Sequence, residues 1–127
     1  MPKQYALPGS QDLNNGTTHY VVPVGVRSAF ERFPGGRNKG IRLTSIADGT
    51  ANTILIVEGN KAIPWTKPED LPFNPNGTPP KLGGYFHTTF HAAFADGQVK
   101  RIPNNVNPTT LKALITRNGG EVVRLDF

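Results

Sequence analysis

Two histidines four residues apart are the most direct candidates for chemistry in this chain. His87 and His91 have the spacing of a metal-binding pair on one face of a helix. The residues around them, however, have the composition of a strand, in which positions four apart lie about 13 Å from each other. A shared metal ion is therefore not the favoured interpretation of this pair.

Three acidic residues are candidates for a calcium site. Glu58 ends an apolar run, and Glu69 and Asp70 follow in a loop rich in proline and asparagine. Carboxylate oxygens are the ligands that calcium prefers, although the regular spacing of a calcium-binding loop is missing here. The alternative is that Glu58 accepts hydrogen bonds from loop amides and that Asp70 caps a turn.

The single tryptophan, Trp65, lies in the same loop. An exposed indole is a stacking platform for a sugar or a peptide, whereas a buried one packs under its own loop. Basic residues gather in the segment 27–42, which includes Arg37, Lys39 and Arg42. Trp65 and this segment together would form a binding module for an anionic polymer or a glycan.

Composition limits the other classes of function. The net charge of +5 fits an anionic partner, but no run of basic residues exceeds two, so nucleic acid is not the expected partner. The absence of cysteine excludes disulfides and thiolate metal sites. No nucleophile elbow surrounds Ser10, Ser28 or Ser45. We therefore expect no enzyme, and no cofactor apart from the calcium considered above.

A hairpin over residues 90–102 is the element expected to organise the fold. Asp96-Gly97 predicts a two-residue turn, because such a turn needs positive φ at both central positions. This register places Phe94 opposite Val99, and the side facing the core then carries Phe90, Phe94 and Val99. The opposite side carries His91, Ala93, Lys100 and Ile102. Asp48-Gly49 is expected to form a turn as well.

The remaining elements complete an α+β domain with an antiparallel sheet. Its 14 glycines and 12 prolines indicate short strands joined by many turns. Residues 1–16 are expected to be an extended lead-in, and residues 17–127 a single globular domain. We predict a strand at 17–24, in which Pro23 indicates an edge position or the end of the strand. Further strands are predicted at 54–58, buried on both faces, and at 121–127. The segment 60–80 is predicted to be a loop, and 29–33 a helical turn.

One helix is predicted over residues 108–117. Asn107 has the side chain of an N-cap, and Pro108 suits the first helical position. Leu111, Leu114 and Ile115 lie on one stripe, which predicts that this face packs on the sheet. The chain has no apolar run of membrane-spanning length and no signal peptide, so we expect no membrane span in it.

Several phrases in order resemble one bacterial family. They are LTSIADGTANTI at 43–54, Glu58, WTKPEDL at 65–71 and FHAAFADGQV at 90–99. This set is similar to domain-of-unknown-function family 1559, abundant in planctomycetes, whose members begin with a prepilin-type segment and end with a histidine followed by Asp-Gly. The family's histidine would stand at Tyr85 or Phe86, and His87 lies closer to the turn.

The resemblance implies a pilin-like or pseudopilin-like protein with a globular, β-rich head on an N-terminal apolar helix. We expect that this anchor helix is missing from the chain. The implied location is the cell surface, the periplasm or the extracellular space, and the implied partners are other protein subunits in an assembly. The family carries no established chemistry. The leading hypothesis is therefore a non-enzymatic structural head, and the alternative is the binding module around Trp65.

Overall fold

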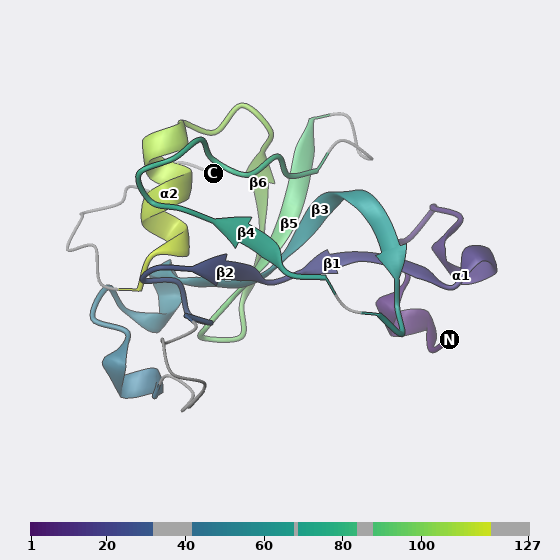
Figure 1. Ribbon diagram of the computed structural model, residues 1–127, viewed down its shortest axis with the longest axis horizontal. Helices are drawn as coiled ribbons and strands as arrows, with labels where there is room; N and C mark the ends of the chain where they lie inside the picture. The colour runs from purple at the N-terminus through teal and green to yellow at the C-terminus, as the bar shows by residue number, and fades with distance from the viewer. Residues whose placement is uncertain (32–41, 68, 84–87, 118–127) are drawn as a thin grey trace.

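The computed structural model describes residues 1–31, 42–67, 69–83 and 88–117, and it has the predicted α+β class (Figure 1). A four-stranded sheet has the strand order β1-β3-β5-β6, and each neighbouring pair is antiparallel. A separate parallel pair is formed by β2 and β4. The strands are β1 (Thr17–Val21), β2 (Pro23–Gly25), β3 (Ile54–Pro64), β4 (Leu71–Phe73), β5 (Thr89–Phe94) and β6 (Val99–Pro103).

Two α-helices and three short 3-10 turns accompany the strands. The helices are α1 (Asp12–Asn15) and α2 (Pro108–Ile115), and the 3-10 turns are Lys3–Tyr5, Leu43–Ser45 and Thr50–Asn52. None of the helices in the described ranges is long and apolar enough to cross a membrane.

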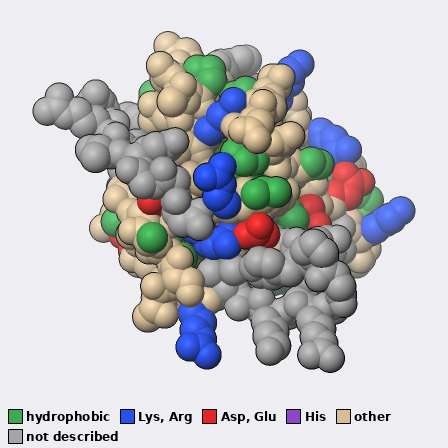
Figure 2. Space-filling model, turned by 60° about the vertical axis from the view of Figure 1, so that its left-hand side comes forward, with side chains coloured by type: hydrophobic (Ala, Val, Ile, Leu, Met, Phe, Trp, Pro, Cys, Tyr) green, Lys and Arg blue, Asp and Glu red, His purple; other side chains and the backbone are tan. Residues whose placement is uncertain are grey.

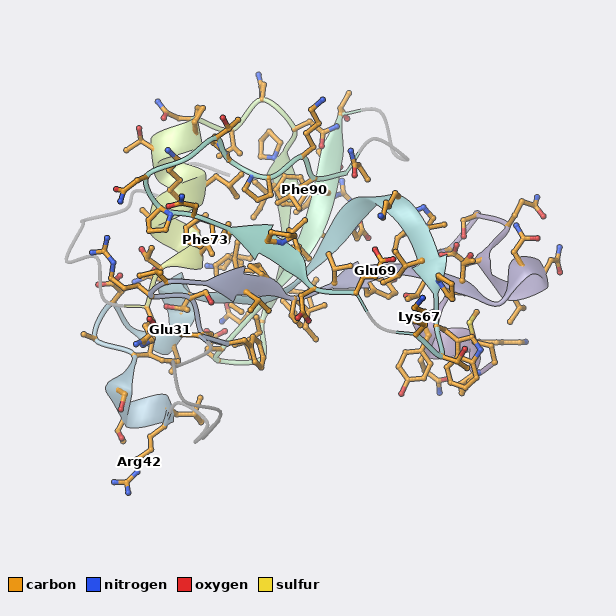
Figure 3. The ribbon with its side chains drawn as sticks, in the orientation of Figure 1. Glu31, Arg42, Lys67, Glu69, Phe73 and Phe90 are labelled. Carbon is orange, nitrogen blue, oxygen red and sulfur yellow. The ribbon has the colours of Figure 1, made fainter. Side chains whose placement is uncertain are left out.

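The core lies between one face of the four-stranded sheet and α2. Side chains at alternate positions of β5, namely Phe90, Ala92 and Phe94, are buried on this face, as strand periodicity requires. Phe73 of β4 belongs to the same cluster and is labelled with Phe90 in Figure 3. The other members of the cluster are Ile54, Val57, Ile102, Leu111, Leu114 and Ile115.

The predicted helix is confirmed, with a slightly earlier end. The Asn107 side chain accepts a hydrogen bond from the Thr109 amide at 2.8 Å, and Pro108 opens the first turn. The buried stripe is the predicted one. The helix ends at Ile115 because Thr116 adopts an extended conformation and forms a bridge with Ser28. The strand predicted at 121–127 lies outside the described residues.

The predicted register of the hairpin is wrong by one residue. The Phe94 amide donates to the Gln98 carbonyl at 2.8 Å, and Gly97 has a φ of 87°, so the loop contains three residues rather than two. Ala93 therefore pairs with Val99, and Phe90 pairs with Ile102. As a result Ile102 is fully buried and Val99, which was expected in the core, is 66% exposed.

A β-bulge also changes the predicted central strand. The register of β3 against β5 shifts between Ile54 and Ile56, so that Ile54 and Val57 both reach the core. Ile56 is 41% exposed, and the run 54–58 is therefore not buried on both faces as expected. The strand also continues to Pro64, and β4 lies at 71–73, so the predicted loop 60–80 contains two strand segments.

The N-terminal segment is folded rather than extended. Residues 1–16 contain a 3-10 turn and α1, and Leu7 and Asp12 are both buried. The cause is the Asp12 carboxylate, which accepts a hydrogen bond from the Leu7 amide at 3.0 Å and so closes the segment on itself. Of the helical turn predicted at 29–33, residues 32 and 33 lie outside the described residues, and Ala29 and Phe30 lie in a turn. A separate turn precedes them, in which the Ser28 amide donates to the Gly25 carbonyl at 3.2 Å.

Candidate binding site on the open sheet face

The face of the four-stranded sheet that is turned away from α2 carries two rows of side chains across the strands. We call it the open face. One row runs through Tyr20 and Glu58, which are paired, and continues through His91 and Arg101, which are also paired. Ile56, Ala93 and Val99 form the adjacent apolar row. The bulge in β3 is what places Ile56 and Glu58 on this face, because it reverses the alternation after Ile54.

Glu58 and His91 form a carboxylate–imidazole pair in the first row. Glu58 is buried, and its Oε1 lies 2.9 Å from Nδ1 of His91. Its Oε2 accepts a hydrogen bond from the backbone amide of His91 at 3.0 Å. One residue therefore satisfies both carboxylate oxygens, and the imidazole is held in one orientation. The His91 side chain remains 38% exposed.

The pair lies in the wall of a mostly apolar groove of about 580 Å³. The sheet supplies Tyr20, Ile56 and Val99 to the groove, and the N-terminal segment adds Tyr5 along one side. Tyr5, Ile56 and Val99 are among the large apolar side chains that the domain exposes. An apolar groove with a few fixed polar groups is the usual form of a binding site.

Tyr20 contributes a protonated phenol to this groove. Burial raises the pKa of Tyr20 above the ordinary value of 10.0, and the negative charges of Glu58 and Asp12 raise it further. The hydroxyl therefore keeps its proton well into the alkaline range.

The titration of Tyr20 provides a direct test of this environment. The ionisation of Tyr20 is the difference in ultraviolet absorbance between the wild type and Tyr20→Phe. We expect this difference to titrate above the ordinary pKa of 10.0. Because the folded pKa is raised, the contribution of Tyr20 to stability is fully present below about pH 10 and is lost as the pH rises toward the folded pKa. Glu58→Gln removes one of the negative charges and should lower the Tyr20 pKa; an unchanged titration would contradict this assignment.

Trp65 is half-exposed and stacks on another aromatic ring. Its ring centroid lies 6.0 Å from that of Tyr5, with an angle of 21° between the planes. The Trp65 amide also donates to the Gly16 carbonyl at 3.1 Å. The indole thus packs on the N-terminal segment and stays 39% exposed, and its use as a stacking platform stays a prediction.

Of the three basic residues named for a combined site with Trp65, Arg42 is the one that lies in the part of the chain that the structure describes. In the view of Figure 3, Arg42 lies at the lower left, well apart from Lys67, which is two residues after Trp65 and lies in the right half of the molecule. Arg37 and Lys39 lie outside the described residues. Among the described side chains on the face drawn in Figure 2, those of Lys and Arg are interleaved with acidic and apolar ones. The combined site for an anionic polymer therefore stays a prediction.

Two of the predicted calcium ligands contact other side chains of the domain. Glu58 is engaged by His91, and Glu69 pairs with Lys61 Nζ at 3.0 Å. Within the described ranges, no group of three or more acidic, histidine or cysteine side chains is arranged to hold a metal ion. Glu58, Glu69 and Asp70 are therefore not gathered into one such group, and a calcium site formed by them stays a prediction. His87 lies outside the described residues.

The turn residues have the structural roles expected of them. Gly97 has a φ of 87°, and the Gln98 amide donates to Oδ1 of Asp96 at 3.0 Å. Gly49 has a φ of 91°, and the Asp48 carbonyl accepts a hydrogen bond from the Asn52 side chain at 3.1 Å.

A second carboxylate–imidazole pair stabilises the N-terminal segment. Oδ2 of Asp12 lies 2.7 Å from Nδ1 of His19, and Oδ1 accepts a hydrogen bond from Thr17 Oγ1 at 2.7 Å. Neither this pair nor the Glu58–His91 pair was predicted from the sequence. The only local signal was the closeness of Asp12, Thr17 and His19 along the chain, and nothing local connects Glu58 with His91.

Comparisons with family models, curated proteins and solved structures give no significant match to this chain. The resemblance to family 1559 stays a prediction.

Proposed function

We propose that this domain is a non-enzymatic assembly module, the head of a pilin-like surface protein, and that it docks to neighbouring subunits through its open sheet face. The observation that carries the proposal is the gathering of exposed Tyr5, Ile56 and Val99 around one groove. Contiguous apolar surface with a polar border is typical of protein interaction sites. A location outside the cytoplasm rests on the resemblance to the pilin-like family.

The polar groups of the groove favour binding over catalysis. The Glu58–His91 pair has the geometry of a base and its orienting carboxylate, but a hydrolase also needs a nucleophile next to the base. Among the described residues, no serine or threonine hydroxyl is hydrogen-bonded to His91. The pair is therefore better suited to recognise a partner group than to activate one.

Light scattering over a concentration series tests the docking of one head to another. We expect the mean mass of the wild-type domain to rise with concentration. Val99→Asp places a charge in the apolar row and should raise the dissociation constant at least about tenfold, since each 1.4 kcal/mol lost has that effect. Val26→Asp is the matched control, because Val26 is 58% exposed but does not line the groove.

The outcome is informative in both directions. A loss of association in Val99→Asp with normal behaviour of Val26→Asp supports docking through the open face. A wild-type domain that stays monomeric at all concentrations, or two variants that behave alike, would overturn it.

A further inference from the structure

We infer that the groove on the open face recognises a tyrosine side chain of its docking partner, through a hydrogen bond from the phenol to Nε2 of His91. The inference rests on the proposed function for the identity of the partner. The preference for an aromatic ring that carries a hydrogen-bond donor follows from the residues of the groove.

The contacts of His91 with Glu58 fix its tautomer. Both oxygens of Glu58 face groups of His91, namely the backbone N–H and Nδ1. An ionised carboxylate only accepts hydrogen bonds, so Nδ1 must carry the proton. In the neutral imidazole Nε2 is then an acceptor with a free lone pair. The buried carboxylate thus determines which kind of group the imidazole offers to a partner.

Nε2 of His91 is available to accept a hydrogen bond from a partner. Among the described residues, Nε2 of His91 has no hydrogen-bond partner, and the side chain is part of the groove wall. A partner that covered the groove with only apolar groups would leave Nε2 without water and without a donor. Such an unsatisfied group costs about 1 to 3 kcal/mol, so a donor is preferred there.

The lining of the groove determines which shape and charge its occupant can have. The groove is bordered by the ring of Tyr5 and by the aliphatic Ile56 and Val99, which suit an aromatic ring. Its volume of about 580 Å³ also leaves room for the residues on either side of an anchoring side chain. The negative charge of Glu58 disfavours an acidic group in this position. Phenylalanine fits the apolar part but lacks the donor, whereas tyrosine has both.

The test uses small analogues of these side chains. In a protein labelled with nitrogen-15, at about pH 8 where an ordinary imidazole is neutral, NMR reports the tautomer of each histidine. We expect His91 to be protonated at Nδ1. p-Cresol, which is the tyrosine side chain, should bind about two- to tenfold more tightly than 4-methylanisole, whose methylated oxygen cannot donate. The p-cresol complex should shift the Nε2 resonance of His91.

Two controls make the test specific. His19 has its own carboxylate partner but does not line the groove, so its resonances should not change on binding. Glu58→Gln offers one acceptor and one donor in place of two acceptors, and it should allow the Nε2-protonated tautomer and remove the preference for p-cresol. The wild-type comparison alone decides the question if this variant is unstable.

The possible results separate this inference from the docking proposal. Equal affinity for the two ligands, or Nε2 protonation in the free wild-type protein, overturns the inference even where light scattering shows association. Selective binding of p-cresol by a domain that never associates supports the groove chemistry and overturns docking between heads.

Discussion

Replacing Glu31 with alanine is expected to lower the free energy of unfolding by about 3 kcal/mol. Glu31 Oε2 lies 2.6 Å from NH2 of Arg117, and both side chains are largely buried. NH1 of Arg117 donates to the Ser28 carbonyl at 2.8 Å, so the guanidinium joins the end of α2 to the segment 25–31. Without Glu31, the buried guanidinium of Arg117 would keep only the neutral Ser28 carbonyl as a partner. A buried charge without a counter-charge is the reason for the large expected loss of stability.

Urea unfolding followed by circular dichroism measures this loss. Glu69→Ala is the matched control, because it breaks an ion pair with Lys61 in which both side chains are exposed. This substitution should lower the free energy of unfolding by less than about 1 kcal/mol. The double substitution Glu31→Ala with Arg117→Met removes the unpaired charge and should restore part of the stability. Equal losses for Glu31→Ala and Glu69→Ala would contradict the assigned role.

The Asp12→Asn substitution is expected to cost about 2 kcal/mol at neutral pH. The carboxylate accepts hydrogen bonds from the Leu7 amide and the Thr17 hydroxyl, and it pairs with His19. Asparagine has a single acceptor oxygen, and its amide donors would face groups that already donate. The folded N-terminal segment should therefore loosen first.

The same carboxylate makes stability depend on pH. Burial alone would raise the pKa of Asp12, but the hydrogen bonds from Thr17, His19 and Leu7, with the charge of His19, outweigh it and lower the pKa below 3.8. The folded form then holds its proton less tightly than the unfolded form. The stabilisation is complete above about pH 4 and is lost as the pH falls through the folded pKa.

Unfolding measured at neutral pH and through the acid range checks this dependence. The Asp12→Asn variant should lose less stability in acid than the wild type, because the titrating group is gone. Asp96→Asn serves as the control, since Asp96 is exposed in its turn and asparagine retains the acceptor oxygen. Identical acid profiles for wild type and Asp12→Asn would show that the carboxylate does not carry the effect.

Features set by neighbouring residues were predictable from the sequence. The N-cap at Asn107 and the buried stripe of α2 depend on residues within one or two helical turns, and both are present as predicted. The Asp96-Gly97 turn was also located correctly, but its loop length was not. An Asp-Gly pair suits both a two-residue and a three-residue loop, and the choice between them moves every following side chain to the other face.

The candidate site depends on features that are not local, and so it was not predicted. The bulge between Ile54 and Ile56 interrupts an unbroken apolar run that gives no sign of it. Glu58 and His91 are 33 residues apart and meet only because β3 and β5 pair. Sequence reasoning linked Glu58 to Glu69 and Asp70 through closeness along the chain, whereas strand pairing gave it a different partner.

The stacking of Trp65 on Tyr5 has a practical consequence for spectroscopy. Trp65 is the single indole in the chain, so the intrinsic tryptophan emission comes from one place. Its neighbour Tyr5 also borders the groove, and a molecule that displaces or covers this ring alters the surroundings of the indole. The unlabelled protein therefore contains its own optical reporter for events at the groove, whereas α2 and the core beneath it require a different probe.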